Sequence, residues 1–250
     1  MMKSGAERVC KETAAIKNSS ATPGVSSPAY WLKVGPTPGM DFVFYLCKLM
    51  TWVFFPLLFK FRVHGRQHIP LDTGALITSN HQSYLDPVFI GAAARRRTGY
   101  IARKTLFKAK SVFTHLISAY GALPMSVDSS SKEGVRLAVE HLRRKEHIAM
   151  FPEGTRTRDG SIGPVHPGAK LIAQKAGVPI VPMALHGAFE IWPRTKKIFG
   201  LGPVSVAFGK PIRPGQLREM KASEFCVYLR KRLVALYTSL ANEKARRPSV

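Results

Sequence analysis

The chain has 250 residues, with 38 lysines and arginines against 15 aspartates and glutamates, which gives a formal net charge of +23. This length allows one substantial core with an appended segment, and the charge indicates a polyanionic partner: nucleic acid, an anionic membrane surface or a phosphate-bearing substrate. The three cysteines, Cys10, Cys47 and Cys226, have no CxxC spacing, which argues against a disulfide framework or a zinc site and favours a reducing compartment.

Residues 1–39 differ in composition from the rest of the chain. They are rich in Ser, Thr, Ala, Pro and Gly and end in a run of turn-forming residues, Val34 to Gly39. This composition predicts a flexible leader that contributes nothing to the core. Because no apolar region follows the early basic residues, we expect no cleaved signal peptide.

Residues 40–61 form the most apolar part of the chain. The run from Phe42 to Phe59 is rich in aromatic residues and contains one charge, Lys48. A helix needs about 20 apolar residues to cross a bilayer, so this run is slightly short, and Pro56 interrupts it. We predict a membrane-anchoring hydrophobic helix that lies in the interface, with a true span and a buried core helix as the alternatives.

Residues 62–244 alternate between short apolar runs and helical patterns. The apolar runs predict strands over residues 75–78, 99–102, 148–151, 180–185 and 204–208. The helical patterns cover residues 88–94, 106–118, 131–144, 168–176 and 222–241. This alternation indicates an α/β fold with a central mixed, mostly parallel sheet flanked by helices.

A polar cluster with a histidine and a carboxylate follows the first predicted strand. A histidine on a loop after a strand, with an aspartate to hold its ring, is the minimum for a general base. On a regular helix, His81 and Asp86 would differ by roughly 140° of rotation, so they can meet only across a turn. Pro87 favours such a turn with Asp86 as the helix N-cap. The alternative is that Asp86 only caps the helix and His81 is an ordinary loop residue.

A second polar cluster, Glu153-Gly154-Thr155-Arg156, follows the strand predicted over residues 148–151. Glycine lets the backbone approach a ligand closely, threonine offers a hydroxyl group, and the planar guanidinium of Arg156 suits phosphate oxygens. The alternative for this tetrapeptide alone is a polar turn with a surface ion pair.

The chain resembles the glycerolipid acyltransferases of the 1-acylglycerol-3-phosphate acyltransferase type over about residues 42–240. Four sequence blocks in the family's order carry the resemblance. They are His81-x4-Asp86; Ile101 to Phe107 leading into a Gly121–Pro124 turn; Phe151 to Arg156; and Val178 to Leu185. The first and third blocks, in this order and spacing, are highly specific for the family.

The resemblance implies a membrane-associated O-acyltransferase whose acyltransferase domain covers residues 62–244. His81 would deprotonate the acceptor hydroxyl as it attacks an acyl thioester, and Asp86 would fix the ring tautomer. No acyl-enzyme is expected, so Ser83 would be structural. The acceptor phosphate would be bound by residues of the third block with help from the second: Glu153, Gly154, Thr155 and Arg156, with Arg103 or Lys104.

The resemblance also implies the partners. The acceptor would be 1-acyl-glycerol-3-phosphate, which would be converted to phosphatidic acid in phospholipid biosynthesis, and the donor would be acyl-CoA or acyl-carrier protein. Neither a metal nor another cofactor is expected. The protein would act at the cytoplasmic face of a membrane with an anionic surface.

One departure from the family pattern concerns the acceptor. Many members carry an arginine a few residues after the Gly121–Pro124 turn, where this chain has Val127. Another lysolipid acceptor is therefore the alternative. A non-catalytic basic protein that binds membranes or nucleic acid is an alternative of a different class, although we expect no nucleic acid because no recognised binding motif is present.

Overall fold

The computed structural model describes residues 46, 49, 53–94, 96, 98–103, 122–125, 132–196, 198 and 200–246, and for residues 101–103, 122–125, 132 and 133 it describes the backbone only. The chain divides into one unit over Met1–Thr37 and a second over Pro38–Val250, which contains every described residue. The predicted leader, the helix predicted over residues 106–118, and Val127 lie outside the described residues, as does most of the predicted anchor.

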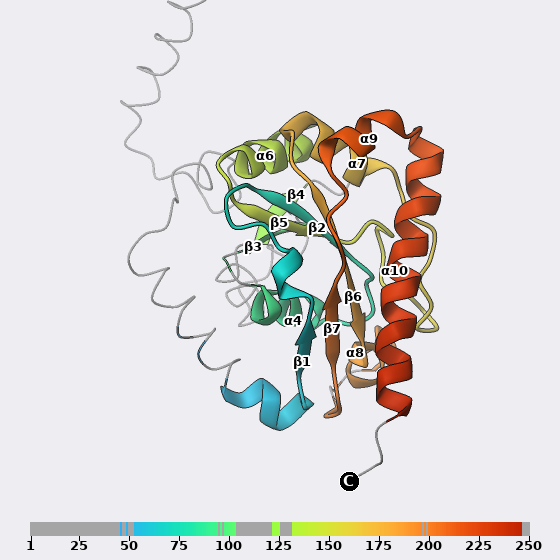
Figure 1. Ribbon diagram of the computed structural model, residues 1–250. Coiled ribbons are helices and arrows are strands. Elements are labelled where there is room, and N and C mark those ends of the chain that lie inside the picture. Colours follow the sequence, from blue (N-terminus) through green and yellow to red (C-terminus); the bar gives the residue numbers. More distant parts are fainter. Residues whose placement is uncertain are drawn as a thin grey trace, which may run out of the picture. The chain divides into compact units, whose positions relative to one another are not determined.

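The described part of the chain is built on a seven-stranded sheet with the order β1-β7-β6-β2-β5-β3-β4. Its strands are β1 Arg62–His64, β2 Ala75–Ser79, β3 Thr98–Arg103, β4 Ala122–Met125, β5 His147–Met150, β6 Ile180–His186 and β7 Ser205–Phe208. The strands from β6 to β4 are all parallel, whereas β7 is antiparallel to β6 and parallel to β1. The predicted mixed, mostly parallel sheet is therefore confirmed (Figure 1).

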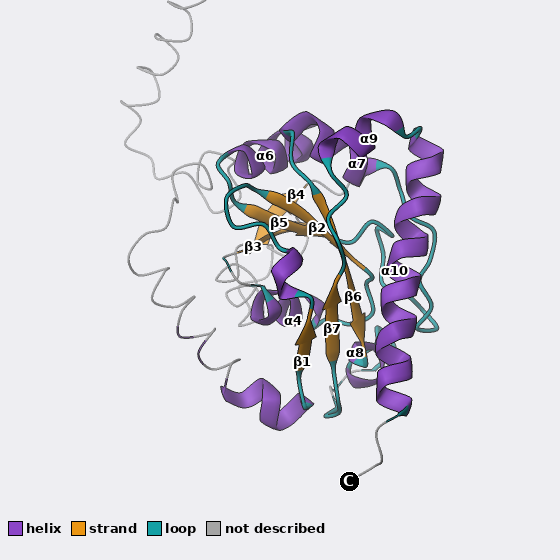
Figure 2. Cartoon of the chain, viewed as in Figure 1, coloured by secondary structure: helices purple, strands orange, loops and turns teal. Residues whose placement is uncertain are grey.

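Helices lie on both faces of this sheet (Figure 2). They are α4 Asp86–Ala93, α6 Lys132–Arg143, α7 Gly168–Ala176, α8 Ala188–Ile191, α9 Pro214–Glu219 and α10 Ala222–Ala245, with a 3-10 turn at Arg66–His68. The predictions of α4, α6, α7 and α10 are confirmed to within a few residues at their ends. The buried side of α10 is formed by Phe225, Leu229, Leu233 and Leu240.

Four short elements of the structure, β1, β4, α8 and α9, were not predicted from the sequence. Strand β1 and helices α8 and α9 have three to six residues, which is too short for a hydrophobic period to appear in the sequence. The predicted Gly121–Pro124 turn is wrong, because residues 122–125 form strand β4. Proline has no backbone N–H to donate to a neighbouring strand. Pro124 is tolerated because β4 is the last strand in the sheet order and is paired on one side, with β3.

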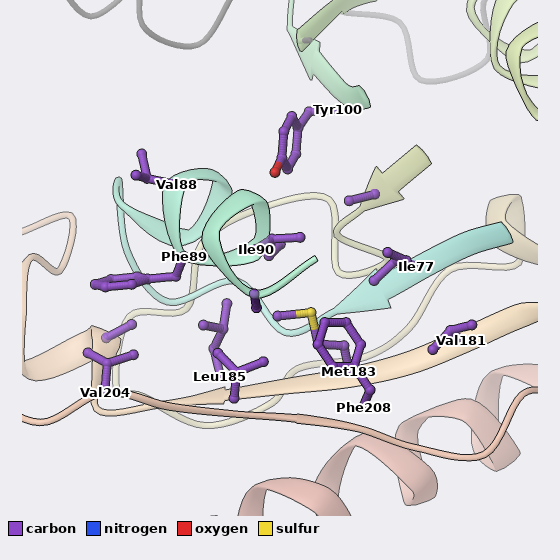
Figure 3. Packing of buried hydrophobic residues seen from close by; sticks show 14 of the residues in the cluster. Ile77, Val88, Phe89, Ile90, Tyr100, Val181, Met183, Leu185, Val204 and Phe208 are labelled. Carbon is purple, nitrogen blue, oxygen red and sulfur yellow. The ribbon is translucent and has the colours of Figure 1, made fainter. Parts of the chain in front are cut away.

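The central strands bury both of their faces. Ala75 and Ile77 of β2 pack into the core under α4, whereas Leu76 packs into a second core under α6, α7 and α10. The same alternation is seen in β6, where Val181 belongs to the first core and Ile180 to the second. Figure 3 shows the first core, with the side chains of α4 lying over those of β2 and β6. Strands buried on both faces are typical of parallel sheets covered by helices.

Residues 53–59 are helical and have two different sides. Phe55 and Phe59 face the first core, where their rings lie 5.2 and 5.3 Å from that of Phe89. The opposite side exposes large apolar groups, of which Leu57 is 77% accessible to solvent. Within the described part of the chain, no helix is long and apolar enough to cross a membrane.

Candidate active site

The two polar clusters meet because their strands are parallel neighbours. Thr78 of β2 pairs with Met150 of β5, so both chains leave the sheet at the same edge. The carboxyl ends of parallel strands form the usual ligand-binding edge of open α/β sheets. Residues 80–86 and 151–163 therefore face each other across this edge, although more than 60 residues of sequence separate them.

His81 and Asp86 are in direct contact. The Nδ1 atom of His81 lies 2.8 Å from Oδ2 of Asp86, which is fully buried. The same oxygen accepts hydrogen bonds from the backbone N–H groups of Gln82 at 2.6 Å and Ser83 at 2.8 Å. A carboxylate on Nδ1 favours the tautomer in which that nitrogen carries the proton and Nε2 is free to accept one.

The prediction that Asp86 caps α4 is wrong. The helix begins at Asp86 itself, Leu85 is its N-cap, and no side chain caps it. Because the carboxylate turns back toward the preceding loop, it serves the His81 ring and two loop amides instead of the helix end. The predicted pairing with His81 is nevertheless present, since the loop from Gln82 to Leu85 forms the required turn.

The backbone and ring of His81 are held from several directions. Its N–H donates to Oε1 of Glu153 at 3.0 Å, and its carbonyl accepts from the Thr157 N–H at 2.8 Å. Its ring is stacked on Phe151, with 3.8 Å between centroids and 11° between planes. The side chain keeps 20% of its surface accessible, and no described residue hydrogen-bonds Nε2. The site thus presents an oriented imidazole with one available nitrogen.

Glu153 faces inward, toward the loops. Its Oε1 accepts from the His81 N–H and its Oε2 from the Gly163 N–H at 2.8 Å. Burial raises the pKa of this carboxyl, while the two amide donors act in the opposite direction. Both oxygens are engaged by backbone, so this side chain joins the two loops, a task that the sequence did not indicate.

Arg156 is placed differently from Glu153, although both lie in the same short loop. Its guanidinium carbon lies 3.4 Å from the centroid of the Tyr84 ring. Its buried Nη1 has no hydrogen-bond partner among the described residues. A buried donor without an acceptor is costly, and the planar fork of arginine suits phosphate or carboxylate oxygens. The arrangement can therefore accept an anion beside His81.

The remaining predicted site residues are Gly154, Thr155, Arg103 and Lys104. Gly154 and Thr155 lie between Glu153 and Arg156 and are exposed. Gly154 has a φ of 71°, a conformation that glycine adopts without strain. Arg103 ends β3, a parallel neighbour of β5, so its backbone reaches the same edge of the sheet. The Arg103 side chain and Lys104 lie outside the described part of the chain.

Three further side chains fix the His81 loop. The Asn80 amide pairs with both backbone groups of Leu185, at 2.8 and 2.9 Å, and so extends the contact between β2 and β6. Gln82 donates to the Gly160 carbonyl at 2.8 Å, and the Ser83 hydroxyl donates to the Trp192 carbonyl at 3.0 Å. Ser83 is thus engaged structurally.

Tyr84 and Gln82 were missed as functional candidates. They stand within the first cluster, but no pattern in the sequence tells which distant groups they meet. As for metals, the described residues contain no group of three or more His, Cys, Asp or Glu side chains that could hold an ion.

Comparison with known protein sequences identifies a family. Residues 60–186 match the family model described as Acyltransferase. A chloroplastic 1-acyl-sn-glycerol-3-phosphate acyltransferase of Brassica napus is 31% identical over 172 residues, which cover 67% of this chain and 49% of that protein. A 1-acyl-sn-glycerol-3-phosphate acyltransferase of Bacillus subtilis is 26% identical over 164 residues, covering 65% and 79%.

The fold also has a counterpart among solved structures. The 1-acyl-sn-glycerophosphate acyltransferase PlsC from Thermotoga maritima superimposes with a TM-score of 0.67 at 23% identity, covering 83% of this chain and 84% of that one. This likeness shows a shared fold. The chain spans about half the length of the plant relatives that it matches.

Proposed function

The chain belongs to the acyltransferase family, and on that premise we propose that it moves an acyl chain from an acyl thioester to the free hydroxyl of 1-acyl-sn-glycerol-3-phosphate, giving phosphatidic acid. One observation carries the proposal: the His81–Asp86 pair, 2.8 Å apart, lies at the carboxyl edge of the sheet next to a loop arginine whose buried Nη1 has no hydrogen-bond partner in the described part of the chain. The names of the relatives support this acceptor.

In the proposed reaction, Nε2 of His81 removes the proton of the acceptor hydroxyl as its oxygen attacks the thioester carbonyl carbon. A C–O bond forms, and the tetrahedral intermediate collapses with cleavage of the C–S bond. The imidazolium then returns its proton to the leaving thiolate, so the products are the ester and a free thiol. Asp86 orients the ring and stabilises its positive charge, as a carboxylate does in other histidine-based sites. General-base assistance of this kind is worth about 10²–10⁴ in rate.

The acceptor phosphate is proposed to bind at Arg156, with Gly154 and Thr155 beside it and with Arg103 or Lys104 adding charge. The Nη1 atom of Arg156 supports this assignment: no residue that the structure describes accepts its hydrogen bond, and an anion would do so. For Glu153 the contacts favour a different task. A carboxylate bound to two loop amides holds His81 in place, and its charge would repel a phosphate.

We also propose that the enzyme works at a membrane surface, with acyl-CoA or acyl-carrier protein as co-substrate and without a further cofactor. Helix 53–59 supports this, because one side packs on the core through Phe55 and Phe59 while Phe54, Leu57 and Leu58 are exposed. A helix with an apolar side toward solvent and basic residues directly after it suits the interfacial layer of a bilayer.

The deciding experiment offers the purified protein several acceptors with each donor. Lysophosphatidic acid and lysolipids with other headgroups are each combined with acyl-CoA or acyl-carrier protein, and products are identified by mass spectrometry. We expect phosphatidic acid from lysophosphatidic acid, and about 10²–10⁴-fold slower formation with His81→Ala. Preference for another lysolipid, which Val127 in place of the family's arginine would favour, would overturn the acceptor while keeping the chemistry.

Arg156→Ala tests the phosphate assignment in the same assay. Loss of a buried arginine–phosphate contact should raise the KM for lysophosphatidic acid by about tenfold or more and leave the KM for the donor unchanged. An unaltered acceptor KM would show that Arg156 does not bind the phosphate.

A further inference from the structure

The segment between α8 and β7 connects the active-site loop with helix 53–59. At its start, the Trp192 carbonyl accepts hydrogen bonds from the Ser83 hydroxyl and from the Tyr84 N–H. At its end, the Val204 N–H donates to the Phe59 carbonyl at 2.8 Å. One stretch of chain is therefore bonded both to the loop that carries His81 and to the apolar helix.

Between these two attachments, the segment exposes large apolar side chains. Ile198 is 81% accessible, more than any other large apolar residue in the described part of the chain, and Leu201 is 64% accessible. Gly200 between them is tied back to Ile191 by a backbone hydrogen bond of 2.9 Å. The two side chains therefore stand on a loop that is anchored at its base.

Basic residues accompany the apolar ones. Arg194 and Lys196 are exposed in the same segment, and Lys60 and Arg62 are exposed directly after helix 53–59. No acidic residue occurs between Trp192 and Val204. We refer to Arg194, Lys196, Ile198 and Leu201 together as the loop surface.

The segment that carries the loop surface is bonded to the end of helix 53–59. The Phe59–Val204 hydrogen bond places the two segments side by side, and Figure 1 shows the helix and the start of β7 at the same end of the sheet. Isolated exposed apolar residues are common on soluble proteins, whereas contiguous ones mark a contact surface. Here the Phe59–Val204 hydrogen bond joins the segment that exposes Ile198 and Leu201 to the helix that exposes Leu57 and Leu58.

We propose that the loop surface is a second membrane contact, which docks on an anionic bilayer together with helix 53–59. Ile198 and Leu201 enter the interfacial layer, and Arg194 and Lys196 lie at the level of the lipid phosphates. The choice of an anionic bilayer rests on charge complementarity, since apolar side chains flanked by basic ones suit this boundary, and on the backbone contact with helix 53–59. It also rests on the proposed function, which requires a lipid acceptor.

This contact has a consequence for the active site. Because the Trp192 carbonyl holds Ser83 and Tyr84, docking through the loop surface brings the His81 loop to the membrane directly. Helix 53–59 alone would be a single contact, about which the domain could tilt relative to the bilayer. Two contacts from distant parts of the sequence define that orientation.

The test measures binding of the full chain to vesicles without any substrate. Vesicles of phosphatidylcholine with phosphatidylglycerol are compared with pure phosphatidylcholine, and bound protein is separated by flotation. The double variant Ile198→Ser/Leu201→Ser should weaken binding about tenfold, given the apolar area removed from the interface. The matched control, Leu171→Ser/Val227→Ser, changes two exposed apolar residues on α7 and α10 and should bind as the parent does.

The charge of the loop surface is tested by Arg194→Gln against Arg218→Gln, an exposed arginine of α9. Only the first should weaken binding to anionic vesicles, by about fivefold, as expected for one basic residue at an anionic surface. Insertion itself is tested with Leu201→Trp, whose fluorescence should shift to shorter wavelength on anionic vesicles and be quenched by brominated lipid chains. Val227→Trp should show neither effect.

The proposal is overturned if Ile198→Ser/Leu201→Ser binds like the parent protein, if both double variants lose binding equally, or if Leu201→Trp is not quenched. Because no substrate is present, these results do not depend on acyl transfer. A protein that docks through the loop surface but forms no phosphatidic acid would refute the proposed function alone.

Discussion

The paired strands β2 and β5 have a histidine at each end, and the two histidines differ in burial and in hydrogen bonding. At the carboxyl end, His81 has its ring held by Asp86 and Phe151 and keeps part of its surface accessible. At the amino end, His147 is fully buried, and neither ring nitrogen has a hydrogen-bond partner among the described residues. Burial, with the charge of Arg96 as a lesser cause, lowers the pKa of His147 to about 4.

The surroundings of His81 suit proton transfer, whereas those of His147 suit a neutral side chain packed in the core. An imidazole that must gain and lose a proton needs a carboxylate on one nitrogen and access to the other. A neutral imidazole inside the sheet needs neither, but its environment disfavours the charged form. A second contrast separates Glu153, whose two oxygens are bonded to backbone N–H groups, from Arg156, whose Nη1 has no partner among the residues described.

The largest expected effect is on acyl transfer by His81→Ala. Removal of the base should lower kcat by about 10²–10⁴, while the melting temperature should change little because the Asp86 carboxylate keeps the N–H donors of Gln82 and Ser83. Radiolabelled acyl transfer and thermal unfolding are measured on the same preparation. Near-normal turnover with an intact fold would remove His81 from the reaction.

The next largest effect concerns the pH dependence of stability at His147. Between pH 6.5 and about 4 the unfolded chain binds a proton on this residue and the folded chain does not, so the folded state loses stability as the pH falls through this window. The contribution is fully present above pH 6.5 and its loss amounts to about 3 kcal/mol by pH 4.

Urea unfolding of the parent and of His147→Phe at several pH values measures this contribution. The slope of the unfolding free energy against pH should be smaller in the variant over this window, whatever its absolute stability. Equal slopes would mean that His147 is protonated in the folded protein.

Glu153→Gln should have an intermediate effect. The amide can accept one of the two backbone N–H groups but presents its own N–H₂ to the other, and an unmade buried hydrogen bond costs about 1–3 kcal/mol. We expect a lower kcat with an unchanged acceptor KM, because His81 is displaced and the phosphate site is not. A rise in acceptor KM like that of Arg156→Ala would instead make Glu153 part of the phosphate site.

The smallest effect is expected at Tyr84, whose ring supports the guanidinium of Arg156. A cation–π contact is worth about 0.5–2 kcal/mol, so Tyr84→Leu should raise the KM for lysophosphatidic acid a few-fold. Tyr84→Phe keeps the ring and should behave as the parent does. If both variants raise KM equally, the hydroxyl rather than the ring face is responsible.

The prediction of the site from sequence was uneven for physical reasons. His81 and Asp86 could be paired because both lie in one turn, where five residues decide the geometry. The task of Glu153 could not be foreseen, since it depends on the N–H groups of His81 and Gly163, which only the pairing of β2 with β5 brings near. The predicted cap at Asp86 failed because a carboxylate has several possible local donors and the sequence does not rank them.

The sequence by itself determined the α/β class, the long helices and the central strands, because these depend on hydrophobic periods that recur within a window of residues. It also determined which residue types could carry the chemistry. The tertiary structure alone decided that β4 is an edge strand able to accept Pro124, that the Tyr84 ring meets Arg156, and that Trp192 and Val204 join the His81 loop to helix 53–59. These are contacts between segments far apart in the chain, and they arise only when the parallel sheet aligns its strands.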